Sequence, residues 1–66
     1  MQIIVNGEAV ELQEGATLLD LLEHLALADG KLPIELNENI VPRSQYAQRR
    51  LSQHDRVEIV HAIGGG

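Results

Sequence analysis

The sequence contains no cysteine, no phenylalanine and no tryptophan, and Tyr46 is its only aromatic residue. A chain without cysteine forms no disulfide and offers no thiol. With 66 residues it is one small domain, which buries only about 60% of the surface that its unfolded form exposes. Its core must therefore be built almost entirely from leucine, isoleucine and valine.

Basic residues are also scarce. Five lysines and arginines stand against ten aspartates and glutamates, which gives a formal net charge of -5. Proteins that bind nucleic acid usually carry a basic patch, so this balance argues against nucleic acid as a partner, and against an anionic membrane surface. An acidic surface keeps a small domain soluble, and it also steers the domain toward a basic partner surface.

No long apolar run is present. Residues 1–5 lack the charged region and the long apolar region of a signal peptide. No apolar stretch approaches the roughly 18 residues that are needed to cross a membrane. We therefore expect a soluble, cytoplasmic protein without a membrane partner.

The first residues predict a β-hairpin. Residues 3–5 are β-branched and favour a strand. Asn6-Gly7 follows, a pair typical of the type I′ turn, because both central positions of that turn need a positive φ. Apolar and polar side chains then alternate over residues 9–12, as expected for the return strand.

A helix is predicted next, at about residues 18–27. Thr17 is a suitable N-cap residue, with Asp20 three positions later in a weak form of the capping box. Leucines recur at helical spacing after it. Asp29-Gly30 supplies a stop signal, because glycine readily takes the left-handed position that follows a helix.

The second half predicts short strands and one longer strand. Short strands are expected at 34–36 and 40–41, followed by a short helical turn within 44–50. A turn at 52–55 leads into a last strand over 56–63. The nearly apolar start of that strand is typical of a strand with neighbours on both sides.

This order of elements predicts an α+β protein of the β-grasp (ubiquitin-like) type. We expect a mixed sheet of about four to five strands, with one main helix packed on one face. Residues 1–62 would form the β-grasp domain, and residues 63–66 a flexible C-terminal glycine tail.

The tail carries the most informative pattern, three consecutive glycines. At an average glycine frequency near 7%, such a run has a chance of about 1 in 3,000 at a given position, although chain ends are often rich in glycine. A terminal carboxylate is ionised at neutral pH and becomes an acyl donor only after activation, for example as an acyl-adenylate. Glycine has no Cβ, so such a tail fits a narrow channel in a partner. The four residues from Ile63 to Gly66 reach roughly 14 Å when extended.

Several segments, spread over nearly the whole sequence, form a recognisable combination: Val5-Asn6-Gly7-Glu8, residues 17–22, residues 36–43, Tyr46, residues 55–60 and the Gly-Gly end. With these segments the sequence resembles the ThiS-type sulfur carriers of thiamin biosynthesis. It departs from them at His54, where the family often has glycine, and at Tyr46, where it often has tryptophan or another aromatic residue.

That resemblance implies a pathway for the terminal carboxylate of Gly66. An E1-like adenylyltransferase would adenylate it with ATP, a sulfur-donor protein would convert it to a thiocarboxylate, and thiazole synthase would receive the sulfur. The chain itself would be no enzyme, would have no catalytic residue and would bind no cofactor. The modified residue would be Gly66 and the tail residues Gly64 and Gly65.

Contacts with the partner are expected from Arg43, Tyr46 and Ile63. Arg43 is the best candidate among the arginines of the C-terminal half. The alternative is that these arginines only form a solvated face. Tyr46 suits a core position as well as a contact position. No metal site is expected, because the three histidines fall on the helix, in a turn and on the last strand: His24, His54 and His61.

Several alternatives stay open at this point. The chain could be the small subunit of molybdopterin synthase, or another sulfur carrier of the same fold. It could be a ubiquitin-like modifier that becomes joined to lysines of other proteins, or a β-grasp binding module with an incidental tail. The sequence does not identify the sulfur donor, the final acceptor or the oligomeric state.

Overall fold

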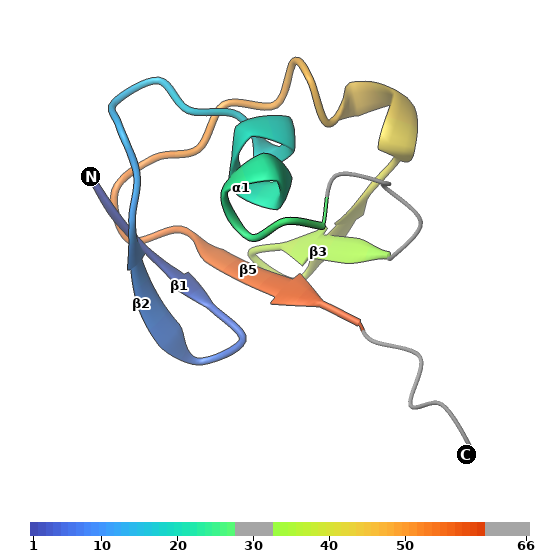
Figure 1. Cartoon of the computed structure of the whole chain (residues 1–66). Helices are drawn as coiled ribbons and strands as arrows, with labels where there is room; N and C mark the ends of the chain where they lie inside the picture. The colour runs from blue at the N-terminus through green and yellow to red at the C-terminus, as the bar shows by residue number, and fades with distance from the viewer. Residues whose placement is uncertain (28–32, 61–66) are drawn as a thin grey trace.

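The computed structural model describes residues 1–27 and 33–60 (Figure 1). Its elements lie in the order β1 (Gln2–Val5), β2 (Glu8–Glu11), α1 (Leu18–His24), β3 (Ile34–Leu36), β4 (Asn39–Val41), the 3-10 helix η1 (Arg43–Gln45) and β5 (Arg56–Ile59). Within this part of the chain no helix is long and apolar enough to cross a membrane.

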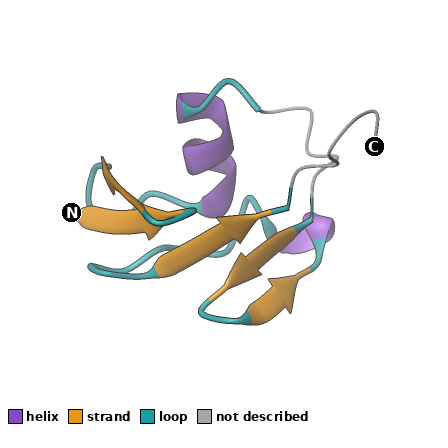
Figure 2. Cartoon of the chain, turned by 90° about the horizontal axis from the view of Figure 1, so that it is seen from below, coloured by secondary structure: helices purple, strands orange, loops and turns teal. Residues whose placement is uncertain are grey.

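The strands form one mixed sheet in the order β2-β1-β5-β3-β4. β1 runs parallel to β5, and the other neighbouring pairs are antiparallel. β5 therefore has a neighbour on each side, as its apolar sequence predicted. α1 lies on one face of the sheet, and no other described element covers the opposite face (Figure 2). This is the predicted α+β arrangement. The predicted domain boundary at residue 62 lies outside the described residues.

The core is aliphatic apart from Tyr46. Helical spacing turns three leucines of α1 toward the sheet, and alternation along the strands turns every second side chain toward α1. Burial of one such side chain stabilises the fold by about 1.5–3 kcal/mol. The largest fully buried side chains are Ile3, Leu18, Leu21, Leu22, Ile34 and Val57.

Both two-residue hairpins use left-handed backbone. Asn6 and Gly7 have φ values of 48° and 84° in the turn between β1 and β2, which confirms the predicted type I′ turn. The turn between β3 and β4 has the same length, with φ values of 50° at Asn37 and 72° at Glu38. Glu38 is strained there, because a side chain with a Cβ disfavours positive φ.

The turn before β5 forms as predicted, although His54 stands where ThiS-type sequences often have glycine. His54 takes a φ of 69°. The N–H of Asp55 donates to the carbonyl of Ser52 at 3.0 Å, and the N–H of Ser52 donates to Oδ2 of Asp55 at 2.7 Å. These two bonds hold the turn with a non-glycine residue in the left-handed position.

α1 begins where the sequence predicted. The N–H of Asp20 donates to Oγ1 of Thr17 at 3.2 Å, and the N–H of Thr17 donates to Oδ2 of Asp20 at 2.9 Å. These reciprocal bonds form a capping box, which satisfies two backbone donors at the start of the helix.

The predicted end of the helix, at residue 27, is wrong. α1 ends at His24, because a Schellman motif closes it early. The N–H of Leu27 donates to the carbonyl of Leu22 at 2.7 Å, and the N–H of Ala26 donates to that of Glu23 at 3.1 Å. Ala26 takes the left-handed position, with a φ of 60°. Leu27 packs against the core, which favours this ending.

The later elements lie close to their predicted positions: β3 has the predicted bounds, and β4 begins one residue earlier than predicted, at Asn39. The short helical turn begins one residue earlier than predicted, as η1, and continues as a turn to residue 48. β5 begins at Arg56 as predicted but ends at Ile59, so the inclusion of Val60 in the predicted strand is wrong. The rest of the predicted strand, from residue 61 to 63, lies outside the described residues.

Candidate functional site

The structure shows where the chain leaves the sheet on its way to the glycine tail. β5 ends at Ile59, and Val60 follows it (Figure 1). We call this part of the molecule the exit end, defined by Asn6, Pro33, Arg43, Ile59 and Val60. Four of the predicted site residues lie outside the described residues: Ile63, Gly64, Gly65 and Gly66.

The sheet register brings Arg43 to the exit end. Ile34 pairs with Ile59 on one side and with Val41 on the other, so these residues form one row across three strands. Neighbouring strands lie about 4.8 Å apart, so the row spans about 10 Å. Arg43 follows Val41 by two residues and begins η1. It therefore lies at the same end of the sheet as Val60.

Arg43 is exposed. Across residues 1–27 and 33–60, no ion pair involves its guanidinium group. The same holds for the other arginines of the C-terminal half, which are also exposed: Arg49, Arg50 and Arg56. A cation at the exit end that has no ion pair with any described residue suits a carboxylate of a partner. The predicted docking role of Arg43 stays a prediction.

Tyr46 lies in the core, one of the two positions that the sequence left open. Its exposed fraction is 4%, and it packs in the same cluster as the leucines of α1. Its carbonyl accepts a hydrogen bond from the N–H of Leu19 at 3.1 Å. Tyr46 thus fastens the segment after η1 to the start of the helix. A direct contact with a partner stays a prediction.

The side chain of Asn6 binds the last residue of β5. Oδ1 of Asn6 accepts from the N–H of Ile59 at 2.8 Å, and Nδ2 donates to the carbonyl of Ile59 at 3.2 Å. On the side of β3, the N–H of Val60 donates to the carbonyl of Pro33 at 3.0 Å. The point from which the tail departs is therefore held from both sides.

The sequence reasoning missed this contact of Asn6. It identified Asn6 only as a turn residue, for which positive φ is the sole requirement. A signal was present, because asparagine carries both a donor and an acceptor, whereas glycine satisfies the turn without either. The partner, Ile59, lies 53 residues away in the sequence, so no local pattern indicates the contact.

The sheet face opposite α1 carries acidic and apolar side chains together. Along β5, Glu58 and Val60 alternate with buried side chains and point outward. Glu35 lies directly opposite Glu58, and Ile40 lies opposite Glu35. Ile40 is 74% exposed and Val60 is 47% exposed. Like charges opposite each other destabilise a sheet, and they favour contact with a partner that brings basic groups.

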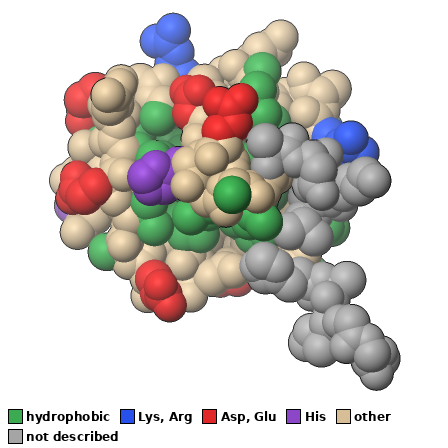
Figure 3. Space-filling model, in the orientation of Figure 1, with side chains coloured by type: hydrophobic (Ala, Val, Ile, Leu, Met, Phe, Trp, Pro, Cys, Tyr) green, Lys and Arg blue, Asp and Glu red, His purple; other side chains and the backbone are tan. Residues whose placement is uncertain are grey.

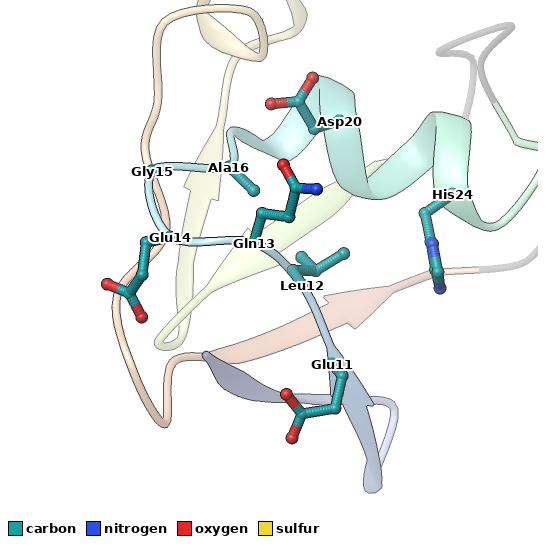
Figure 4. A pocket seen from close by; sticks show the side chains of 8 residues that line it. All are labelled: Glu11, Leu12, Gln13, Glu14, Gly15, Ala16, Asp20 and His24. Carbon is teal, nitrogen blue, oxygen red and sulfur yellow. The ribbon is translucent and has the colours of Figure 1, made fainter.

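Acidic side chains are spread over the surface elsewhere too, as Figure 3 shows in the orientation of Figure 1. A depression of about 660 Å³ lies between α1 and the segment that joins β2 to it (Figure 4). Its ionisable side chains belong to Glu11, Glu14, Asp20 and His24. No group of three potential metal ligands occurs in the described part of the chain.

This depression lies away from the exit end. Glu11 pairs with Gln2, at the start of β1, whereas Asn6 follows the end of β1. Asp20 is already bonded within the capping box. A smaller and mainly apolar depression, of about 300 Å³, does adjoin the exit end, where Asn6 and Ile59 line it together with Leu25. The exit end is therefore the better candidate for a functional surface.

The family model and the similar proteins found by comparison agree with one another. A model of the ThiS family matches residues 3–66. The sulfur carrier protein ThiS of Escherichia coli (strain K12) is 35% identical over 66 residues, which cover all of both chains. The thiazole synthases of Magnetococcus marinus and Paramagnetospirillum magneticum are 41% and 39% identical over 66 residues. The chain spans only 20% of the length of each of these two synthases.

Solved structures agree with the sequence comparison. The crystal structure of a thiamine biosynthesis protein (ThiS) from Geobacter metallireducens superposes with a TM-score of 0.82 at 28% identity. The alignment covers all of both chains. This likeness confirms the predicted β-grasp architecture, with one helix on a mixed five-stranded sheet.

Proposed function

Because the chain belongs to the ThiS family, we propose that it is a sulfur carrier of thiamin biosynthesis that holds sulfur on the carboxyl group of Gly66. The observation that carries this proposal is the family match, which extends through the glycine tail to residue 66. A relative with matching ends and the name of a sulfur carrier supports it. The proposal requires Gly66 to be the C-terminal residue of the working protein.

The proposed chemistry has two steps. A carboxylate oxygen of Gly66 attacks the α-phosphorus of ATP, pyrophosphate leaves, and an acyl-adenylate forms. A sulfur nucleophile, in the simplest case hydrosulfide, then attacks the acyl carbon. AMP leaves with the bonding electron pair, and loss of the sulfur-bound proton gives the thiocarboxylate. The absence of cysteine means that no side-chain thiol competes for this role.

In this proposal the chain is a substrate of its partners, not an enzyme. ATP belongs to an E1-like adenylyltransferase, into whose active site the tail threads. Glycine suits that path, because three residues without Cβ pass a narrow channel and adopt any φ. A sulfur-donor protein supplies the sulfur. We place these reactions in the cytoplasm, together with the ATP-dependent partner.

Thiazole synthase is the proposed acceptor of the sulfur. Two proteins named thiazole synthase contain a segment similar to this whole chain, which supports a close working relation between such a domain and the synthase. The exit end offers the exposed residues Arg43 and Val60 as contacts for either partner, together with Ile40 on the sheet face opposite α1.

Reconstitution tests the proposal. The purified chain is incubated with the adenylyltransferase of its own organism, ATP and sulfide, and its intact mass is measured, with a reaction lacking ATP as the control. We expect a gain equal to the replacement of one oxygen by sulfur, located at Gly66. In a lysate supplemented with ATP, adducts joined to lysines of other proteins would instead indicate a ubiquitin-like modifier. If no adenylate forms, the remaining alternative is that the chain is a binding module.

A further inference from the structure

The side chain of Asn6 does more than its turn requires. A type I′ turn needs a residue that tolerates positive φ, and glycine meets that need. The register of β1 with β5 ends where Val5 lies opposite Val57, and the last backbone bond between the described residues there runs from the N–H of Asn6 to the carbonyl of Val57 at 2.9 Å. Beyond this point β1 turns away into the hairpin, and the amide of Asn6 continues the pairing as far as Ile59.

The backbone of Ile59 depends on this amide. In a strand, the N–H and the carbonyl of one residue point to the same side, and at Ile59 both point toward Asn6. Ile59 is only 4% exposed. Within the described residues these two bonds are the ones that satisfy its backbone. A buried backbone group that loses its partner is costly, so Asn6 holds the end of β5 in place.

We propose that Asn6 is a positioning residue, which fixes the root of the terminal segment so that Gly66 enters the partner's active site from a constant point. This inference rests on the proposed function. Seven residues follow Ile59, from Val60 to Gly66, and they span about 25 Å when extended. If the end of β5 is released at Ile59, the point from which the terminal residues leave the sheet moves. A displacement of the reacting atoms by about 1 Å costs on the order of 100-fold in rate.

Asn37 provides a matched control at the other end of β5. It occupies the corresponding position of the hairpin between β3 and β4, with a φ of 50°. Its Oδ1 accepts from the N–H of Arg56 at 2.9 Å, and its Nδ2 donates to Oδ1 of Asp55 at 3.1 Å. Asn37 thus holds the start of the strand, whereas Asn6 holds the end from which the tail departs.

Hydrogen exchange tests the anchoring without any partner. Asn6→Gly and Asn37→Gly both keep a residue suited to positive φ and remove one side-chain amide. We expect the Ile59 amide to exchange about tenfold faster in Asn6→Gly, since its hydrogen bonds are lost. The exchange rate of the Val57 amide should change to the same extent in both variants. An Ile59 amide that stays as protected as in the parent would overturn the anchoring.

Adenylation kinetics test the positioning. We expect Asn6→Gly to lower kcat by about tenfold with KM within about twofold of the parent, because docking is intact and the approach of Gly66 is not. Asn37→Gly should change neither. Asn6→Asp keeps the acceptor for the Ile59 N–H and should recover part of kcat.

The possible failures are distinguishable. Equal kcat values for the parent and Asn6→Gly, or equal losses in both glycine variants, would overturn the positioning role and leave the proposed function standing. If the parent itself is not adenylated, the proposed function fails and the positioning role fails with it. The exchange rates at Ile59 still decide whether Asn6 holds the strand.

Discussion

Ala26 occupies a left-handed backbone position that favours glycine, so Ala26→Gly should stabilise the protein. An alanine at positive φ costs about 1–2 kcal/mol, whereas glycine adds about 0.4–1 kcal/mol of unfolded-state entropy that is lost on folding. The methyl group of Ala26 is exposed, so its removal sacrifices no burial. The net gain is about 0.8 kcal/mol, which in a domain of this size raises the Tm by about 5 °C.

Thermal unfolding followed by circular dichroism measures this shift. Ala47→Gly is the matched control, because Ala47 is exposed but lies outside the positive-φ residues. The same chemical change there should lower the Tm, since glycine only adds unfolded-state entropy. If both variants lower the Tm to the same extent, the Schellman ending of α1 is not the ending in solution, and the reasoning fails.

Three further predictions concern the exit end and the tail. One residue added after Gly66 should abolish adenylation and leave the Tm unchanged; normal ATP-pyrophosphate exchange by the extended chain would contradict a reactive terminus. Arg43→Ala should weaken binding to the adenylating partner, and less so at high salt, because the Debye length is about 10 Å at 0.1 M; equal losses at all salt concentrations would count against it. Gly65→Val should melt within about 0.5 kcal/mol of the parent but lose most acyl-adenylate formation, because a branched Cβ stiffens the tail; near-normal adenylation would exclude a tight channel.

The sequence predicted the sheet well, because strand patterns and turn residues are local signals. The Asn6-Gly7 pair and the alternation after it specify the first hairpin without reference to the rest of the chain. The position of β5 between two neighbours also followed from its own apolar composition. Each of these inferences needed only residues that lie close together in the sequence.

The end of α1 shows where such reasoning fails. Asp29-Gly30 was the strongest stop signal, yet the chain leaves the helix at Ala26, a residue with high helix propensity. The contact of Leu27 with the core and the two Schellman bonds favour the earlier ending. Tertiary packing therefore overrides propensity, and no local pattern at Ala26 announces it.

The candidate site was predicted only in part for a related reason. The exposure of Arg43 and the burial of Tyr46 depend on how the segment after η1 packs against α1, which no spacing in the sequence reveals. The bond between Asn6 and Ile59 joins residues at opposite ends of the chain. The chemistry of the tail needs no such contact, so the residue types alone suggested it.

Intact-mass measurement on protein from the native host tests whether Gly66 carries sulfur on its terminal carboxyl group. The protein is purified from its native host during growth without external thiamin, and its intact mass and C-terminal fragments are determined. We expect a fraction of molecules in which one oxygen at Gly66 is replaced by sulfur. A protein that carries only an unmodified carboxylate under these conditions, or that continues beyond Gly66, would contradict it.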